Sequence, residues 1–204
     1  MSSAAAPASP LPHLHFYFDV LSPYAYLAFE RLPQALAGLS YSVSYQPVFL
    51  PALLKHWGQK GPVEIAPKRE WVLHQVDWLA RRHGIPLQWP AVHPFNPLPL
   101  LRLAQACVPA VGGTPSRWVT EAVLRHVWCG EGADPCASDR LAALEVRLAP
   151  AGLPGGDAKA ALTQATNEAI ALGVFGVPTL ALRGRLYWGL DSLDMVAEAL
   201  QSGT

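Results

Sequence analysis

Hydrophobic and polar positions follow two different periods along this chain, and each period is confined to its own regions. Near the start, an aromatic-rich segment at residues 13–19 predicts a buried β-strand. Apolar residues then recur at helical spacing over 25–36 and predict a helix that ends near Gly38. Residues 41–49 alternate and predict a second strand, closed off by Pro51. The long connection favours a crossover, so these elements predict a parallel βαβ unit.

The helical period dominates from residue 52 to about residue 151. Four amphipathic segments, separated by proline-rich stretches, predict helices at 67–84, 98–107, 118–127 and 141–148. About a hundred residues of this kind are too many for a loop, so we interpret them as an inserted domain.

The strand pattern returns near the C-terminal end. Asp157 is the predicted N-cap of a helix that ends at Gly173. Strands at 178–182 and 186–188, joined by a tight turn at 183–185, predict an antiparallel hairpin. Asp191 is the predicted N-cap of a last helix through residues 193–200, with Asp194 three residues later.

This order of elements predicts the α/β class, namely a thioredoxin-like fold with an inserted all-helical domain. We divide the chain into a disordered tail at 1–12, a thioredoxin-like domain at 13–51 and 157–204, and an inserted helical domain at 52–156. In such folds a group at the first strand-to-helix junction faces a cis-proline that precedes the third strand. Ser22 and the Val177–Pro178 bond occupy these two places, so we predict that this bond is cis.

Ser22 is the main candidate for chemistry. It lies at a strand-to-helix junction, and Pro23 takes the first helical turn, where a missing N–H costs least. Such a junction presents free backbone N–H groups and the positive end of a helix dipole, which together stabilise an anion. The alternative is that Ser22 serves only as an N-cap.

Composition narrows the class of protein. The chain has 204 residues, zero formal net charge and no cluster of Lys and Arg, which argues against a nucleic-acid partner. Three cysteines without a C-x-x-C pair fit a reducing compartment. No apolar run reaches the ~18 residues of a membrane span, and the first dozen residues do not resemble a signal peptide, so we predict a cytoplasmic protein without a membrane partner. The histidines lack metal-ligand spacing, and we predict no metal site.

An ordered set of motifs connects the chain to a known family. The motifs are FYFDVLSPYAYL at 16–27, PVFL at 47–50, HPFNPL at 93–98, LGVFGVPT at 172–179 and WGLD at 188–191. Together they resemble the 2-hydroxychromene-2-carboxylate isomerases and the related kappa-class glutathione transferases. The resemblance extends over nearly the whole chain after the tail.

The resemblance implies that the chain binds glutathione as a cofactor. It implies that Ser22 contacts the glutathione sulfur, that the Val177 backbone pairs with the cysteinyl part beside Pro178, and that Asp191 binds the γ-glutamyl ammonium. The other cofactor residues that it implies are Pro23, Tyr24, Gln59 and Ser192. Two of these depart from the pattern of the family, because Gln59 stands where relatives usually have Asn and Ser192 where they commonly have Arg. The substrate residues that it implies are His93, Asn96 and Trp188.

The implied activity is the glutathione-dependent isomerisation of a small aromatic 2-oxo or hydroxy acid in aromatic-ring catabolism. Cis–trans conversion about a conjugated double bond requires a nucleophile that adds and leaves again, which a bound thiolate would supply. Two rival classes stay open: a glutathione transferase or thiol–disulfide oxidoreductase of the same fold, and a non-catalytic glutathione-binding module. The oxidoreductase is disfavoured because residues 22–25 contain no cysteine. The oligomeric state is open as well, with a homodimer as the commonest assembly.

Overall fold

The computed structural model describes residues 11–149 and 155–203, and a four-stranded mixed sheet lies at its centre. The strands are β1 (His13–Phe18), β2 (Ser42–Pro47), β3 (Thr179–Leu182) and β4 (Arg185–Trp188), in the order β2-β1-β3-β4. β1 is parallel to β2, whereas the β1–β3 and β3–β4 pairs are antiparallel. This arrangement confirms the predicted α/β class, the parallel βαβ unit and the antiparallel hairpin.

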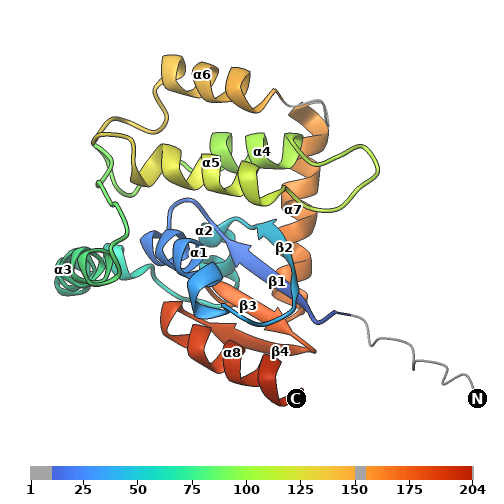
Figure 1. The fold of residues 1–204 in the computed structure, drawn as a ribbon. Coiled ribbons are helices and arrows are strands. Elements are labelled where there is room, and N and C mark those ends of the chain that lie inside the picture. Colours follow the sequence, from blue (N-terminus) through green and yellow to red (C-terminus); the bar gives the residue numbers. More distant parts are fainter. Residues whose placement is uncertain (1–10, 150–154, 204) are drawn as a thin grey trace, which may run out of the picture.

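Eight α-helices of the described ranges surround the sheet. They are α1 (Pro23–Ala35), α2 (Leu50–His56), α3 (Ala66–His83), α4 (Leu98–Ala106), α5 (Arg117–Trp128), α6 (Ser138–Leu148), α7 (Gly155–Ala171) and α8 (Leu193–Ser202). In Figure 1, α4, α5 and α6 lie together above the sheet, α8 lies below it beside β4, and α3 lies at the edge of the molecule next to α1.

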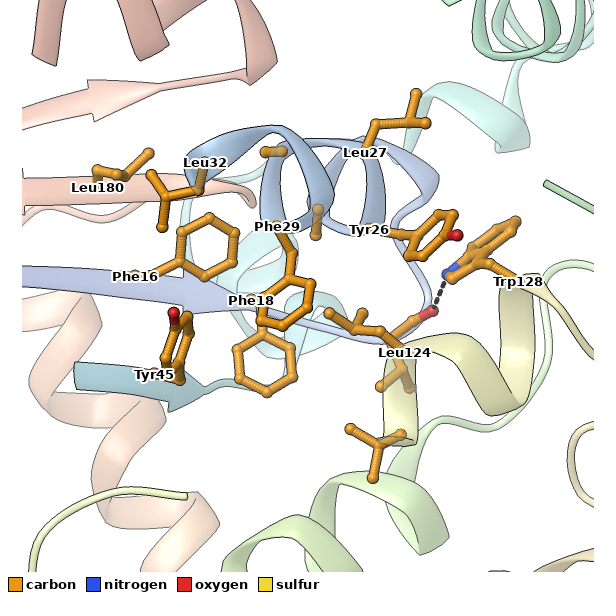
Figure 2. Close-up of a cluster of buried hydrophobic side chains, with 14 of the residues drawn as sticks. Phe16, Phe18, Tyr26, Leu27, Phe29, Leu32, Tyr45, Leu124, Trp128 and Leu180 are labelled. Atoms are coloured by element: carbon orange, nitrogen blue, oxygen red, sulfur yellow. Dashed lines mark hydrogen bonds between the residues drawn. The ribbon is translucent and has the colours of Figure 1, made fainter. Parts of the chain in front are cut away.

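The side chains of β1 alternate between two hydrophobic clusters, one on each face of the sheet. Phe16 and Phe18 point into the larger cluster, which also contains Phe29 of α1 and Trp128 of α5 (Figure 2). Tyr17 points the opposite way, into the smaller cluster. The buried members of this smaller cluster are Tyr17, Val48, Leu53, Ala169, Val174 and Val177.

The helices between β2 and α7 share their core with the sheet. Leu101 of α4, Leu124 of α5 and Leu144 of α6 belong to the same cluster as Phe16. The helical part therefore packs directly on the thioredoxin-like part through one continuous apolar interior. The exact boundaries of the predicted domains, at residues 52 and 156, stay a prediction.

Helix α2 is absent from the sequence prediction. The predicted strand at 41–49 ends earlier, at Pro47, and Pro51 lies in the first turn of α2 instead of closing a strand. Proline is well tolerated there because the first helical N–H groups have no partner within the helix. α2 has only 7 residues, fewer than two full turns, which is too short to produce a recognisable helical period in the sequence.

Two predicted helix caps are wrong. α7 already begins at Gly155, so Asp157 lies within its first turn rather than before it. Asp191 lies in a short 3-10 turn, Leu190–Ser192, and α8 begins after it at Leu193. This turn follows Gly189, whose φ of +96° redirects the chain before the helix can start. By contrast, Gly173 ends α7 as predicted, with a φ of +87°.

The predicted tail at 1–12 falls almost entirely outside the described residues. The hairpin turn has two residues, Arg183 and Gly184, which both have positive φ as this kind of tight turn requires. Among the helices of 11–149 and 155–203, none has both the length and the apolar character that crossing a bilayer demands.

Candidate functional site

Ser22 lies where β1 passes into α1, and its backbone and side chain both serve the start of that helix. It is the N-cap residue, with extended backbone angles, and its Oγ accepts a hydrogen bond from the Ala25 N–H at 3.3 Å. The predicted capping role is therefore confirmed. The side chain is 6% exposed, so the hydroxyl lies in a closed environment at the positive end of α1.

The residues before β3 face Ser22 directly. The Val177–Pro178 bond is cis, as predicted, and the Ser22 hydroxyl donates to the Val177 carbonyl at 3.3 Å. No hydrogen bond from the Val177 N–H to the described residues is present. The Gly189 N–H donates to the Pro178 carbonyl at 2.9 Å, which draws the segment before α8 to the same place. The fold thus brings together Ser22, the cis-proline and the Gly189 turn.

Asp19, three residues before Ser22, is fully buried. Its Oδ1 accepts from the Leu21 N–H at 2.9 Å, and its Oδ2 accepts from the Leu50 N–H at 2.8 Å. Burial raises the pKa of this carboxyl from 3.8 to about 7, although the two backbone hydrogen bonds act in the opposite direction. Its backbone carbonyl accepts from the Ser22 N–H at 3.1 Å, so Asp19 contacts the loop through both main chain and side chain.

Two aromatic rings from the helical part bind the carbonyls of the same loop. The Trp128 indole donates to the Val20 carbonyl at 3.0 Å, the dashed bond in Figure 2. His93 Nε2 lies 2.9 Å from the Leu21 carbonyl, and a carbonyl can only accept, so this nitrogen bears the proton. Two neighbouring rings, both distant in sequence, therefore hold the loop before Ser22.

His93 lies in an aromatic environment. Its ring is 5.4 Å from Trp89, 5.6 Å from Trp128 and 6.4 Å from Phe95, measured between ring centroids. Burial lowers its pKa, which favours the neutral imidazole. The His93–Pro94 bond is also cis, a feature that the sequence analysis missed. The His93 ring thus binds the Leu21 carbonyl. Its role in binding a substrate stays a prediction.

The predicted γ-glutamyl side of the site is open. Asp191 is exposed and lies close to the Gly189 backbone, and Gln59 is exposed as well. Ser192 is buried, and its hydroxyl donates to the Gly189 carbonyl at 2.8 Å. Ser192 therefore stabilises the turn and presents no charge to a ligand.

Two aromatic side chains, Phe175 and Trp188, flank the cis-proline segment. Trp188 of β4 is 54% exposed, and its ring centroid lies 5.1 Å from that of Phe175. A Cβ added at Gly176 would lie only 2.8 Å from the Trp188 indole nitrogen, so the ring rests on the glycine backbone. Trp57, at the end of α2, donates to the Val174 carbonyl at 3.0 Å.

Three remaining predicted site residues lie in different settings. Pro23 is buried at the start of α1, and the neighbouring Tyr24 is half-buried, with its hydroxyl donating to Gln75 of α3 at 2.6 Å. Asn96 is exposed, and its Oδ1 accepts from the Leu98 N–H at 3.2 Å. The Asn96 side chain therefore assists the start of α4, and no contact with Ser22 or Pro178 is present.

Sequence reasoning missed four residues that shape the site: Asp19, Trp57, Trp128 and Phe175. Only Asp19 gave a usable indication, because a carboxylate directly after a buried strand needs a partner. The partners of the other three are backbone carbonyls or a ring far along the chain. No cluster of three or more His, Cys, Asp and Glu side chains within residues 11–149 and 155–203 could bind a metal ion.

The sequence matches the profile of the DSBA-like thioredoxin domain over residues 13–201. It is 29% identical to a 2-hydroxychromene-2-carboxylate isomerase of Sphingobium xenophagum, an alignment that covers 92% of this chain and 97% of that protein. It is also 35% identical to a kappa glutathione S-transferase of Caenorhabditis elegans, over 39% of this chain and 36% of that protein.

A comparison of structures finds the same fold. A solved 2-hydroxychromene-2-carboxylate isomerase superposes with a TM-score of 0.72 at 24% identity. The superposition covers 93% of this chain and 95% of that chain. The helices between β2 and α7 are thus included in the similarity, together with the sheet.

Proposed function

The chain belongs to the DSBA-like thioredoxin domain family, and from that premise and the site we propose that it is a glutathione-dependent isomerase of the 2-hydroxychromene-2-carboxylate type. The proposed substrate is a small aromatic 2-oxo or hydroxy acid, and the proposed setting is aromatic-ring catabolism. The relative from Sphingobium, similar along nearly its whole length, supports this choice.

The observation that carries the proposal is the position of the Ser22 hydroxyl. It lies at the N-terminus of α1 and donates across to the carbonyl of Val177, beside cis-Pro178. A serine at this place cannot exchange disulfides, and residues 22–25 contain no cysteine that could. It can, however, donate a hydrogen bond to an anion, and the helix N-terminus favours that anion further.

When bound, glutathione would supply a thiolate that adds reversibly to the conjugated double bond, so that rotation becomes possible. The Ser22 hydroxyl would donate to that thiolate. Its present bond to Val177 is 3.3 Å long, against a usual O–H···O distance of about 2.7–2.8 Å, so giving up that bond costs little.

Ser22 and the helix terminus together can shift the protonation of a thiol. A hydrogen bond to a charged group contributes about 1.5–3 kcal/mol, and the helix N-terminus adds about 0.3–1 kcal/mol. At 1.36 kcal/mol per pKa unit, the hydrogen bond alone lowers a thiol pKa near 8.5 by roughly 1–2 units, and together with the helix N-terminus the shift is roughly 1–3 units. A large fraction would then be thiolate at neutral pH.

The chain also offers groups that fit the rest of the cofactor. The Val177 N–H, which has no hydrogen-bond partner among the described residues, can pair with a peptide group, and the exposed Asp191 carboxylate can bind an ammonium. Gln59 supplies an amide at the end of α2, while Pro23 and Tyr24 form the adjoining helix start. A cation for a carboxylate of the cofactor is missing at Ser192.

On the substrate side, we assign Trp188, His93 and Asn96 to contacts with the aromatic acid. Trp188 and Phe175 form an exposed apolar surface that suits an aromatic ring. The three cysteines are free in the structure, which supports a reducing, cytoplasmic location. We further propose a homodimer on general grounds, and neither a nucleic acid nor a membrane as a partner.

The proposal is tested by following the isomerisation of 2-hydroxychromene-2-carboxylate by the purified protein, with and without added glutathione. We expect turnover only in its presence. Conjugation of glutathione to an electrophilic aryl halide, without isomerisation, would replace the isomerase by a kappa-like transferase. Binding of glutathione without either reaction would identify a non-catalytic binding module.

A further inference from the structure

The carboxylate of Asp19 occupies an unusual place beside Ser22. It has no exposed surface, and each of its oxygens accepts a backbone N–H, one from Leu21 and one from Leu50. Among the described residues, this side chain forms no ion pair, and its hydrogen-bond partners are these two backbone N–H groups. Burying a carboxylate away from water costs free energy. We therefore look for the role of Asp19 in the two segments that its hydrogen bonds join.

Asp19 connects two segments that meet at the candidate site. The Leu21 N–H belongs to the loop that carries Ser22, and the Ser22 N–H itself donates to the Asp19 carbonyl. The Leu50 N–H lies at the start of α2, where the N-cap residue Phe49 supplies no side-chain acceptor. The carboxylate therefore accepts a hydrogen bond from an N–H that has no partner within α2, at the positive end of this helix.

The far end of α2 reaches the other half of the site. Trp57 follows this helix and donates to the Val174 carbonyl, in the segment that leads to Val177 and Pro178. Gln59 follows two residues later. Through α2, one carboxylate thus links the Ser22 loop to the segment that faces Ser22.

We propose that Asp19 is a positioning residue that fixes the Ser22 hydroxyl in place through the two backbone hydrogen bonds of its carboxylate, without touching any ligand. The catalytic part of this inference rests on the proposed function of Ser22. Asp19 itself takes no part in the chemistry, because both oxygens are occupied and its side chain is closed off from the site surface.

Thr166 offers a matched control, because it accepts from the backbone N–H of Phe49, the residue directly before Leu50. Thr166 of α7 is 3% exposed, and its hydroxyl accepts from the Phe49 N–H at 3.0 Å. Thr166→Val removes this bond and leaves the Ser22 loop untouched. Asp19→Asn keeps the side-chain shape, but its amide NH2 cannot accept, so one of the two N–H groups loses its partner.

The first measurement is amide hydrogen exchange in the protein without ligand. Local opening controls such exchange. We expect Asp19→Asn to accelerate exchange at Leu21 and Ser22 by at least about tenfold relative to the parent, whereas Thr166→Val leaves both unchanged. Unchanged rates at both residues in Asp19→Asn would overturn the proposal.

The second measurement is a double-mutant cycle on the isomerisation rate in the presence of glutathione. Asp19→Asn should lower kcat by about tenfold when Ser22 is present and by less than about twofold in the Ser22→Ala background, because its effect passes through Ser22. An equal loss in both backgrounds would refute positioning, since the charge of Asp19 would then act on the reaction independently of Ser22.

The two measurements distinguish a failure of the positioning proposal from a failure of the proposed function. If the parent neither binds glutathione nor isomerises the substrate, the proposed function is wrong, and the exchange rates alone decide whether Asp19 fixes the loop. If Asp19→Asn does not fold, Asp19→Ser takes its place with the same expectations at Ser22, because its short side chain avoids placing an amide donor against a backbone N–H.

Discussion

The two sides of the candidate site are built in opposite ways. On one side, Ser22 is 6% exposed, and the loop before it is fixed by Trp128, His93 and Asp19. On the other side, Asp191 is exposed in a short turn, and the only contact of the neighbouring Ser192 hydroxyl among the described residues is internal to that turn. One side is buried and held by hydrogen bonds, and the other is open.

This difference separates chemistry from affinity. Stabilising a thiolate requires a hydroxyl at a fixed place in a dry environment, and the buried side provides it. Binding the charged ends of a tripeptide requires exposed groups that a ligand can reach, and of the proposed contacts on this side Asp191 is charged whereas Gln59 and Ser192 are not. Changes on the buried side should therefore alter stability and turnover together, whereas changes on the open side should alter binding alone.

The largest expected effect concerns the buried carboxyl of Asp19. Its pKa is raised from 3.8 to about 7, so between these pH values the folded protein binds a proton that the unfolded chain releases. Protonation of Asp19 therefore adds to the free energy of unfolding. This addition is complete below pH ~4 and is lost as the pH rises through 7, by up to about 4 kcal/mol at 1.36 kcal/mol per pKa unit.

Urea titrations at several pH values between 4.5 and 8 measure this contribution as the difference between the parent and Asp19→Asn. The histidines with lowered pKa values, such as His93 and His126, change stability in the opposite direction, but they do so in both proteins. Parallel stability curves for the two proteins would contradict a raised pKa of the Asp19 carboxyl.

The next effect compares two tryptophans, one on each side of the site. Trp128 is fully buried and donates to the Val20 carbonyl, whereas Trp188 is 54% exposed. Trp128→Phe leaves a buried carbonyl without its donor and should lower the free energy of unfolding by about 1–3 kcal/mol. Trp188→Phe should change it by less than about 0.5 kcal/mol. Equal losses in urea denaturation would remove the distinction between a buried and an open side.

A smaller effect is expected at Asp191. Asp191→Asn removes a charge that would bind an ammonium and should weaken glutathione binding by about tenfold, or roughly 1.4 kcal/mol. The melting temperature should hardly change, because this side chain caps no helix. The control is Asp194→Asn, because Asp194 is also an exposed carboxylate, in the first turn of α8. This variant should leave the affinity for glutathione unchanged in a calorimetric titration. Equal affinities for all three proteins would exclude Asp191 from the cofactor site.

What the sequence could predict follows from the range of the interactions involved. The four strands, seven of the eight described helices and the cap at Ser22 follow from local residue patterns and were predicted, whereas the short helix α2 was not. The cis bond before Pro178 was predicted from the order of elements in the fold, since an X-Pro bond alone favours trans. The failed cap at Asp191 depends on the positive φ of Gly189, which a helical pattern does not reveal. The contacts of Asp19 are backbone N–H groups, one of them 31 residues away, and no pattern of side chains marks them.

The most direct measurement is an ultraviolet pH titration of the thiol of glutathione bound to the parent and to Ser22→Ala. In the parent we expect a midpoint roughly 1–3 units below the usual thiol value near 8.5, and in Ser22→Ala a midpoint roughly 1–2 units higher than in the parent. Isomerisation at neutral pH should fall by about ten- to a hundredfold in the variant and recover in part as the pH is raised.

Ser116→Ala is the matched control, because Ser116 caps α5 through the Val119 N–H at 3.3 Å, the same distance as the cap at Ser22. Each variant should lose up to ~1–2 kcal/mol of stability as a missing cap, but Ser116→Ala should leave the thiol midpoint unchanged. A downward-shifted midpoint in the parent that rises only in Ser22→Ala is the predicted result. Identical midpoints in the parent and Ser22→Ala would show that Ser22 is a helix cap without a catalytic role.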